Sequence, residues 1–385
     1  MANKNVLAFD LGASNGRAIL GKFDGEKLDL EVLHKFSNGA EAVAGEQYWD
    51  IIRLWHEIKS GLNQAGQKEE TIDSIGVDTW AVDYGLLDQR GNLMSNPYFY
   101  RDQRTDGLVD EVTNIIPKKD IYDNTGIQFM QINTLYQLFS ETKYRPWILD
   151  EAEDLLFIPD LINYFLTGDK YNEYTNASTS QMFNPVTEEW VNSIFDKLDI
   201  PTDIMQDLIY PGDKIGNLTD QVKEECGITQ EIPVMAVGSH DTASAVAATP
   251  LEDREKSIYI STGTWCLLGM ELDQPFITSE TLAENFTNEC GVSKKIRFLK
   301  NICGLWLIQE SKKSWAKQGL DLSYDDIEKA AYDAGPAQFK IDPNDDRFLN
   351  PKDMPEAIRE YCRETNQPVP GNYGEIARGI YESLA

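Results

Sequence analysis

Two short turns in the 385-residue chain combine residue types that bind phosphate. The first turn runs from Asp10 to Arg17 and reads DLGASNGR. Its small residues leave successive backbone N–H groups accessible, and such a set of amides binds phosphate oxygens. Arg17 adds a guanidinium suited to phosphate, and Asp10 could hold a magnesium ion through water. A plain β-hairpin with an exposed aspartate explains the same pattern, so both interpretations stay open.

The second turn reads Ser261-Thr262-Gly263-Thr264 and repeats this chemistry, with hydroxyls and a glycine between two predicted strands. Alone, such a sequence is typical of an ordinary turn. Together, the two turns could bind a polyphosphate from both sides. We also expect Gly12 and Gly16 to require positive φ, because a β-branched residue resists that backbone conformation.

A third segment, GSHDTASA at 238–245, places Asp241 between a predicted buried strand and a predicted helix of small residues. The helix dipole favours an ionised carboxylate there. Such a carboxylate can accept the proton of a substrate hydroxyl during phosphoryl transfer. The alternative is that Asp241 only caps the helix and that His240 lies on the surface. The small residues that follow indicate close packing and favour a functional site.

Two further stretches have a pattern that suits ligand binding. VDTWAVDY at 77–84 mixes polar and aromatic residues at a predicted strand end, which suits a sugar site or simply an amphipathic strand. The sequence also predicts a helix over 301–319 with Asn301 as its N-cap. Gln309 lies eight residues further on, so both amides would fall on one broad face of that helix.

These segments must be positioned by an alternating pattern of strands and helices, which predicts α/β architecture. We expect strands at 5–10, 17–23, 72–78, 84–87 and 232–238, a strand-turn-strand hairpin at 257–270, and helices at 48–62, 152–166 and 187–198. The hairpins at 5–23 and 257–270 share one plan, which predicts two similar domains with a cleft between them. We place these domains at residues 1–245 and 246–385.

The overall composition excludes several classes of function. The net charge of −29 repels phosphate backbones and anionic lipid, so we expect no nucleic-acid or membrane partner. No apolar run is long enough for a membrane span, and the first ten residues do not resemble a signal peptide. Five scattered cysteines and three histidines argue against a structural zinc site. They indicate a reduced, cytoplasmic setting.

The sequence resembles the FGGY family of carbohydrate kinases, within the actin- and hexokinase-like ATPases. The motifs that carry this resemblance are FDLGASNGR at 9–17, VDTWAVD at 77–83, YFYRDQRT at 98–105, GSHDTASAV at 238–246, STGTW at 261–265 and LKNICGLWLIQ at 299–309. They occur in order along the whole chain. The resemblance implies two actin-like (ribonuclease H-like) ATPase domains with an interdomain cleft.

Two of these motifs, GSHDTASAV and NICGLWLIQ, resemble those of the branch of the family that phosphorylates L-rhamnulose at O1 with ATP, whereas the first turn is shared by all sugar kinases of this type. The resemblance implies that Asp241 is the general base and that Asp10 anchors the water of Mg²⁺. It implies ketose contacts from Ala81, His240, Asp241, Thr242 and Asn301. It implies ATP contacts from Ala13, Ser14, Asn15, Gly16, Arg17, Thr264 and Gln309. The family commonly has glycine where Ala81 stands here.

The end of the sequence departs from the family pattern, because family members continue further and supply a Gly-rich loop for adenosine. Asn372 and Glu375 predict a helix start, and apolar positions follow until the chain stops at Ala385. We therefore expect a truncated second domain whose last helix has an unpartnered apolar face. The alternatives are another ketose kinase, for fuculose or xylulose, and a catalytically silent sugar-binding fragment.

Overall fold

The computed structural model describes residues 4–68, 70–254 and 256–385. It divides into two compact units. The first unit comprises Met1–Ile258 and Gly269–Leu299, and the second comprises Tyr259–Leu268 and Lys300–Ala385. Because the chain passes between the units more than once, this division does not test the domain boundary placed after residue 245.

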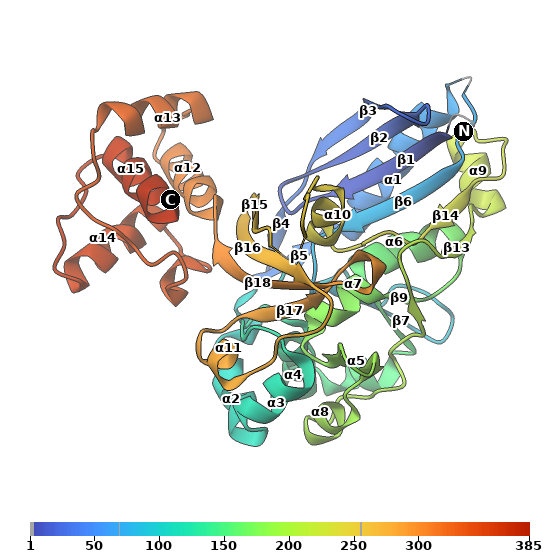
Figure 1. Cartoon of the computed structure of the whole chain (residues 1–385), viewed down its shortest axis with the longest axis horizontal. Coiled ribbons are helices and arrows are strands. Elements are labelled where there is room, and N and C mark those ends of the chain that lie inside the picture. Colours follow the sequence, from blue (N-terminus) through green and yellow to red (C-terminus); the bar gives the residue numbers. More distant parts are fainter. Residues whose placement is uncertain (1–3, 69, 255) are drawn as a thin grey trace. The chain divides into compact units, whose positions relative to one another are not determined.

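The first unit is built on a six-stranded sheet in the order β13-β14-β6-β1-β2-β3 (Figure 1). Its strands are β1 (Lys4–Leu11), β2 (Asn15–Phe23), β3 (Leu28–Ser37), β6 (Ser74–Thr79), β13 (Lys214–Asn217) and β14 (Pro233–Met235). β1 pairs antiparallel with β2 and parallel with β6. Leu7, Phe9 and Leu11 alternate along β1 and are fully buried, so one face of the sheet forms core.

Helices cover this sheet because their apolar faces need a partner. α1 (Ile51–Gly66) packs against β2 and β3, and α6 (Ile158–Thr167) packs against β6 and β14. Asp50 begins α1 by accepting a hydrogen bond from the backbone N–H of Arg53. Ile51, Leu54 and Ile58 recur at helical spacing and are fully buried. The helix predicted at 48–62 is therefore confirmed, with its start moved by a few residues.

The rest of the first unit is largely helical, and a separate hydrophobic cluster is formed by buried residues between Tyr84 and Ile204. The helices of this part are α2 (Leu108–Ile115), α3 (Lys118–Thr125), α4 (Thr134–Tyr144), α5 (Pro146–Glu151), α7 (Tyr174–Ala177), α8 (Asn192–Lys197), α9 (Asp220–Cys226), α10 (Asp241–Ala248) and α11 (Ser279–Ala283). Among them, α9 packs against α1 and α10 packs against β6. The short strands of this part are β4 (Ala40–Val43), β5 (Glu46–Trp49), β7 (Tyr84–Leu87), β8 (Asp154–Phe157), β9 (Asn172–Glu173), β10 (Phe183–Asn184), β11 (Glu189–Trp190) and β12 (Leu208–Ile209).

A further sheet has the order β15-β16-β18-β17. Its strands are β15 (Tyr259–Thr262), β16 (Trp265–Leu272), β17 (Thr287–Cys290) and β18 (Ile296–Cys303). The hairpin predicted at 257–270 is thus present as β15 and β16. The second unit adds α12 (Trp306–Lys317), α13 (Tyr324–Asp333), α14 (Met354–Glu364) and α15 (Tyr373–Leu384).

α15 starts as predicted, because the Asn372 side chain accepts a hydrogen bond from the backbone N–H of Glu375. The expectation of an unpartnered apolar face on this helix is wrong. Ile376 and Ile380 are fully buried in one cluster with residues of α12, α13 and α14, including Ile358. The helices of the second unit therefore form a hydrophobic core of their own.

Three predicted helices are corrected by the structure. Residues 301–303 belong to β18, and α12 starts only at Trp306, so Asn301 is not a helix N-cap. The predicted helix at 152–166 opens with β8, and the one at 187–198 shrinks to α8. In each case strand pairing overrides a local helical pattern, through distant residues where β8 pairs with β7 and through a short hairpin where β10 pairs with β11.

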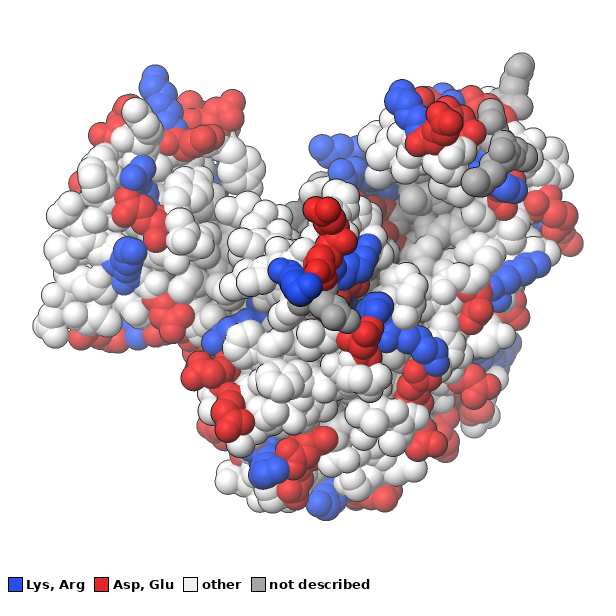
Figure 2. Space-filling view, viewed as in Figure 1, with Lys and Arg blue, Asp and Glu red and all other residues white. Residues whose placement is uncertain are grey.

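The many charged residues of the sequence are visible on the surface (Figure 2). Figure 2 shows acidic and basic side chains interspersed over the drawn face. All five cysteines are free thiols. Among the helices built from described residues, none has the length and apolar character that crossing a membrane requires.

Candidate functional site

The parallel pairing of β1 with β6 places two aspartates side by side. Asp10 pairs with Asp78, and Leu11 pairs with Thr79. The segment before α10 joins this edge, because the backbone N–H of Thr79 donates to the carbonyl of Ser239 at 2.9 Å. Asp241 follows two residues later. Ligands of open α/β sheets bind at the carboxyl ends of the strands, which is where these carboxylates lie.

The three carboxylates influence one another electrostatically. Desolvation, followed by the charges of Asp10 and Asp241, raises the pKa of Asp78 well above its usual value. Desolvation is also the main cause that raises the pKa of Asp241 to about 6. Arg17 donates from Nη2 to Oδ2 of Asp10 at 2.6 Å and offsets part of this negative charge. The edge is therefore acidic and favours a cationic or proton-bearing ligand.

The donors at this acidic edge suit magnesium in their chemistry. Carboxylate oxygens are suitable donors for Mg²⁺, which usually keeps several waters and takes few protein ligands. Across the described residues, however, no group of three or more potential ligands is arranged to hold a metal directly. The chemistry of the donors thus fits an ion bound largely through water. The role of Asp10 as the anchor of that water stays a prediction.

The first of the two turns predicted to bind phosphate is a tight connection between β1 and β2. Gly12 donates its N–H to the carbonyl of Asn15 at 2.9 Å, which closes the turn. Asn38 fixes it from the side, because its backbone N–H bonds the carbonyl of Ser14 and its amide bonds the carbonyl of Gly12. Ser14, Asn15 and Arg17 are exposed, and Ala13 is half-buried. These side chains are accessible to a ligand.

The explanation predicted for the two glycines of this turn is wrong. Neither Gly12 nor Gly16 belongs to the positive-φ glycines of the structure. Gly16 is buried, and a Cβ atom there would overlap the ring of Phe36 and crowd Leu11. Close packing therefore requires glycine at position 16.

Asp241 is the first residue of α10, and its side chain is about 40% exposed. Its Oδ1 accepts hydrogen bonds from the backbone N–H of Thr242 at 2.6 Å and from the Thr242 hydroxyl at 3.1 Å. His240 occupies the N-cap position but makes no side-chain cap bond. His240 is only 8% exposed, so the alternative of a surface histidine beside a capping aspartate is wrong.

A buried glutamate fixes the backbone just before Asp241. Glu173 accepts hydrogen bonds through Oε2 from the backbone N–H and the hydroxyl of Ser239, at 3.2 and 2.6 Å. The same carboxylate caps the start of α7, because it accepts hydrogen bonds from the backbone N–H groups of Thr175 and Asn176. Sequence reasoning missed Glu173, because no local pattern relates it to residue 239.

The loop after β6 carries Ala81, which is half-buried. The neighbouring Val82 has a φ of 67°, an uncommon value for a β-branched residue. Its carbonyl accepts hydrogen bonds from Thr134 and Gln137 on α4, which hold this conformation. Backbone strain of this kind persists only when surrounding contacts fix it, and it concentrates at functional sites.

Asp83 secures this loop from the interior and is 1% exposed. Its Oδ2 accepts from the indole N–H groups of Trp49 at 2.5 Å and Trp80 at 2.9 Å. Its Oδ1 accepts from the amide of Gln137 at 2.8 Å. Desolvation raises the pKa of Asp83 to about 7. Asp78 and Asp83 both lie in the noted segment 77–84, but the sequence did not single them out.

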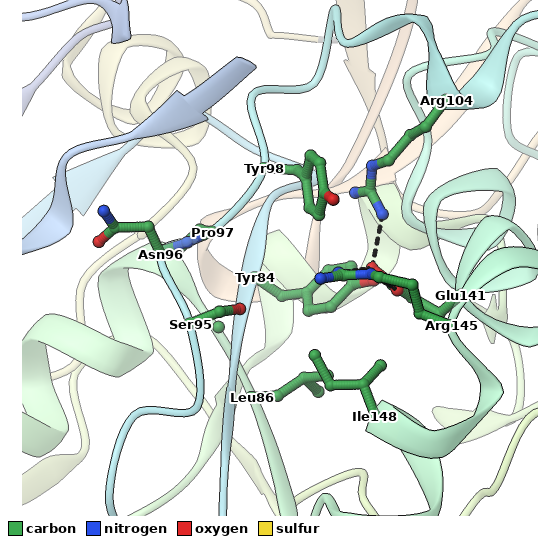
Figure 3. Close-up of a pocket in the computed structure, with 11 residues that line it drawn as sticks. Tyr84, Leu86, Ser95, Asn96, Pro97, Tyr98, Arg104, Glu141, Arg145 and Ile148 are labelled. Carbon is green, nitrogen blue, oxygen red and sulfur yellow. Dashed lines mark hydrogen bonds and ion pairs between the residues drawn. The ribbon is translucent and has the colours of Figure 1, made fainter. Parts of the chain in front are cut away.

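Tyr98, Arg104, Glu141 and Arg145 are among the residues that line a small pocket (Figure 3). Arg104 and Arg145 lie over the ring of Tyr98, and both form ion pairs with the buried Glu141. Arg104 also donates to the side-chain oxygen of Gln137 at 2.8 Å. Because Gln137 in turn bonds Asp83, this charged cluster supports the loop that carries Ala81.

The remaining predicted site residues belong to the second unit. The hydroxyl of Thr264 donates to Oε1 of Gln309 at 3.4 Å, so two predicted ATP-binding residues lie together. Gly304 and Trp306 donate their backbone N–H groups to the carbonyl of Thr264. These bonds connect the β15–β16 turn to the start of α12. Asn301 lies in β18 and is half-buried.

Comparison with known proteins identifies relatives of the whole chain. Residues 5–247 match the N-terminal domain of the FGGY family of carbohydrate kinases, and residues 258–385 match its C-terminal domain. The rhamnulokinase of Bacteroides thetaiotaomicron is 45% identical over 99% of this chain and 78% of that protein. The rhamnulokinase of Pectobacterium atrosepticum is 44% identical over 100% of this chain and 76% of that protein.

Solved structures show the same fold at low sequence identity. A ligand-bound xylulose kinase from Lactobacillus acidophilus has a TM-score of 0.77 and 16% identity, covering 99% of this chain and 76% of that one. The Plasmodium falciparum glycerol kinase with ADP has a TM-score of 0.71 and 16% identity over the same shares. The predicted two-domain α/β fold is therefore confirmed.

Proposed function

The chain belongs to the FGGY family of carbohydrate kinases, and from this premise we propose that it transfers the γ-phosphoryl group of ATP to O1 of L-rhamnulose. Its rhamnulokinase relatives, at 41–45% identity, support this activity. The product is L-rhamnulose 1-phosphate.

The observation that carries this proposal is the position and protonation of Asp241. Its carboxylate lies at the strand-end edge, is partly exposed, and has a pKa of about 6. It is therefore mostly ionised at neutral pH, yet basic enough to accept a proton. A general base is most effective when its pKa lies near the working pH.

In the proposed reaction the carboxylate of Asp241 accepts the proton of the O1 hydroxyl. O1 then bonds the γ-phosphorus as the bond from that phosphorus to the bridging oxygen of ADP breaks. Thr242 orients the carboxylate through its two hydrogen bonds. We assign ketose contacts to Ala81, His240, Thr242 and Asn301.

We assign nucleotide contacts to both turns. In the first unit the residues are Ala13, Ser14, Asn15, Gly16 and Arg17, and in the second they are Thr264 and Gln309. Accessible amides and the guanidinium of Arg17 suit phosphate oxygens. Mg²⁺, when bound with ATP, would neutralise phosphate charge, and Asp10 would hold one of its waters.

The test is ATP-coupled turnover with Asp241→Asn. We expect turnover to fall by roughly two to four orders of magnitude while ketose affinity is largely kept, because only proton acceptance is lost. Asp196→Asn is the matched control, since Asp196 is an exposed aspartate on α8. Near-normal turnover of Asp241→Asn would refute the assignment of the base.

A panel of ketoses tests the substrate. We expect L-rhamnulose to have a higher kcat/KM than L-fuculose or D-xylulose. A preference for either of those sugars would assign the chain to another ketose kinase. Ketose binding by calorimetry without turnover would identify a silent sugar-binding protein.

A further inference from the structure

His240 is in contact with a fully buried arginine from a distant part of the sequence. Arg297 lies in β18 and has no exposed surface. Its Nη2 lies 3.0 Å from Nδ1 of His240. The same guanidinium donates from Nε and Nη2 to the carbonyl of Cys290, which fixes its plane. The position of this guanidinium is therefore set independently of His240.

The direction of this hydrogen bond determines where the proton of His240 lies. Arginine stays protonated in proteins and has no acceptor, so Nη2 must donate. Nδ1 must then accept through its lone pair, and it carries no proton. A neutral imidazole with a bare Nδ1 has its proton on Nε2.

Glu289 is the competing partner of Nδ1. Its Oε2 lies 3.4 Å from Nδ1, further than Nη2 of Arg297. That oxygen is already paired with Nη1 of Arg297 at 3.1 Å, because Glu289 and Arg297 are opposite residues of β17 and β18. A proton on Nδ1 would instead point at an N–H of Arg297, so the shorter contact decides the tautomer.

The surroundings also disfavour a charged imidazole. Desolvation, and after it the positive charge of Arg297, lowers the pKa of His240 well below its usual value. The charged groups in contact with its ring are Arg297 from β18, Glu289 from β17 and Asp241 from α10. The cation opposes a second proton, and the nearest carboxylate on that side is already paired with it.

We infer that Arg297 is a positioning residue that holds His240 neutral with its proton on Nε2, so that the imidazole offers an N–H donor beside Asp241. Nε2 lies 3.5 Å from Oδ1 of Asp241. With the opposite tautomer, two acceptors would face each other there. If the proposed function holds, this N–H recognises an oxygen of the ketose next to the hydroxyl that Asp241 deprotonates.

The tautomer can be observed directly in the unmodified protein, without any turnover. The chain has three histidines, so ¹⁵N-histidine labelling gives few signals, and His240→Gln identifies those of His240. At pH 7 we expect Nδ1 of His240 to have the shift of an unprotonated ring nitrogen and Nε2 that of a protonated one. A protonated Nδ1, or rapid exchange between both tautomers, overturns the inference.

Variants then connect the tautomer to Arg297. Arg297→Lys keeps a cationic donor and is expected to keep the Nε2–H signal. The paired variant Arg297→Met with Glu289→Met removes both charges and leaves no orphaned carboxylate, so we expect a mixture of the two tautomers. An unchanged, single Nε2–H tautomer in the paired variant would show that Arg297 does not set it.

Kinetics separate positioning from structural support. We expect the ketose KM of the paired variant to rise roughly 3- to 10-fold, the loss of about one hydrogen bond, with a smaller change in kcat. Arg297→Lys should restore most of the affinity. A ketose KM unchanged in the paired variant would overturn the substrate part of the inference. Because the NMR result needs no activity, failure of the proposed kinase function would leave the tautomer result intact and would be recognised separately.

Discussion

Replacing the buried carboxylate of Asp83 by an amide is expected to change how the free energy of unfolding depends on pH. Its hydrogen-bond partners are all donors: two indole N–H groups, the amide of Gln137 and the backbone N–H of Tyr100. Asp83→Asn keeps one acceptor oxygen but places an NH₂ group against another donor. Gln137 cannot simply rotate its amide, because its Oε1 accepts from Arg104.

The magnitude follows from the pKa of Asp83, which is about 7 in the folded protein against 3.8 for an ordinary aspartate. A group whose folded pKa is raised contributes most to stability at low pH, and that contribution is lost as pH rises through the folded value. Between pH 5 and pH 8 the wild type should lose about 2.5 kcal/mol of unfolding free energy through this carboxylate. The amide introduced by Asp83→Asn cannot ionise, so the variant lacks this component.

The assay is urea unfolding of wild type and Asp83→Asn at several pH values from 5 to 8, followed by tryptophan fluorescence. Other buried acids titrate in both proteins, so the difference between them isolates Asp83. Asp196→Asn, at an exposed position, serves as the control and should run parallel to the wild type. A wild-type-minus-variant difference that stays constant over this pH range would refute the reasoning.

Three further predictions concern the first unit. The kcat/KM for ketose should fall as pH drops through about 6 and level off above it, because protonated Asp241 cannot accept a proton; a pH series of coupled assays checks this. Glu173→Gln should lower the urea midpoint by the equivalent of about 2–4 kcal/mol and reduce kcat, since one amide cannot accept from all the present donors. Gly16→Ala should cost about 1–3 kcal/mol in urea unfolding, and Phe36→Leu should recover part of that loss by making room for the methyl group.

The local structures around the candidate site that were predicted correctly are those encoded by neighbouring residues. The first turn is a hairpin because small residues and an Asn-Gly pair follow an alternating strand. Asp241 begins a helix of small residues as predicted, although the strand predicted before it at 232–238 is only β14 (Pro233–Met235). Residues within about ten positions of one another determine each of these features, and a local sequence pattern covers that range.

The placement of Asn301 shows where local patterns fail. Its segment has the spacing of a helix, and the asparagine is a good N-cap residue. In the structure the run from Ile296 to Cys303 is a strand, and its first half pairs with β17. Pairing within the sheet, where β18 lies between β17 and β16, outweighs the weak helical preference of one turn. Gln309 does lie on a helix, but Asn301 does not share it.

Asp83, Glu173 and Arg297 were missed for a related reason, and their shared geometry explains their presence. Each is almost completely buried and bonds a residue in or next to the site: Trp80, Ser239 and His240, respectively. Burying such groups is unfavourable unless every lone pair or N–H finds a partner. Some of those partners come from distant segments, as Trp49 does for Asp83, Ser239 for Glu173 and His240 for Arg297, so the sequence pattern cannot reveal them. Glu173 fixes the backbone of Ser239 beyond the strand ends, whereas Asp83 and Arg297 fix the side chains of Trp80 and His240. The changes predicted for Asp83→Asn, Glu173→Gln and the paired Arg297 variant each follow from removing one such buried group with several bonds.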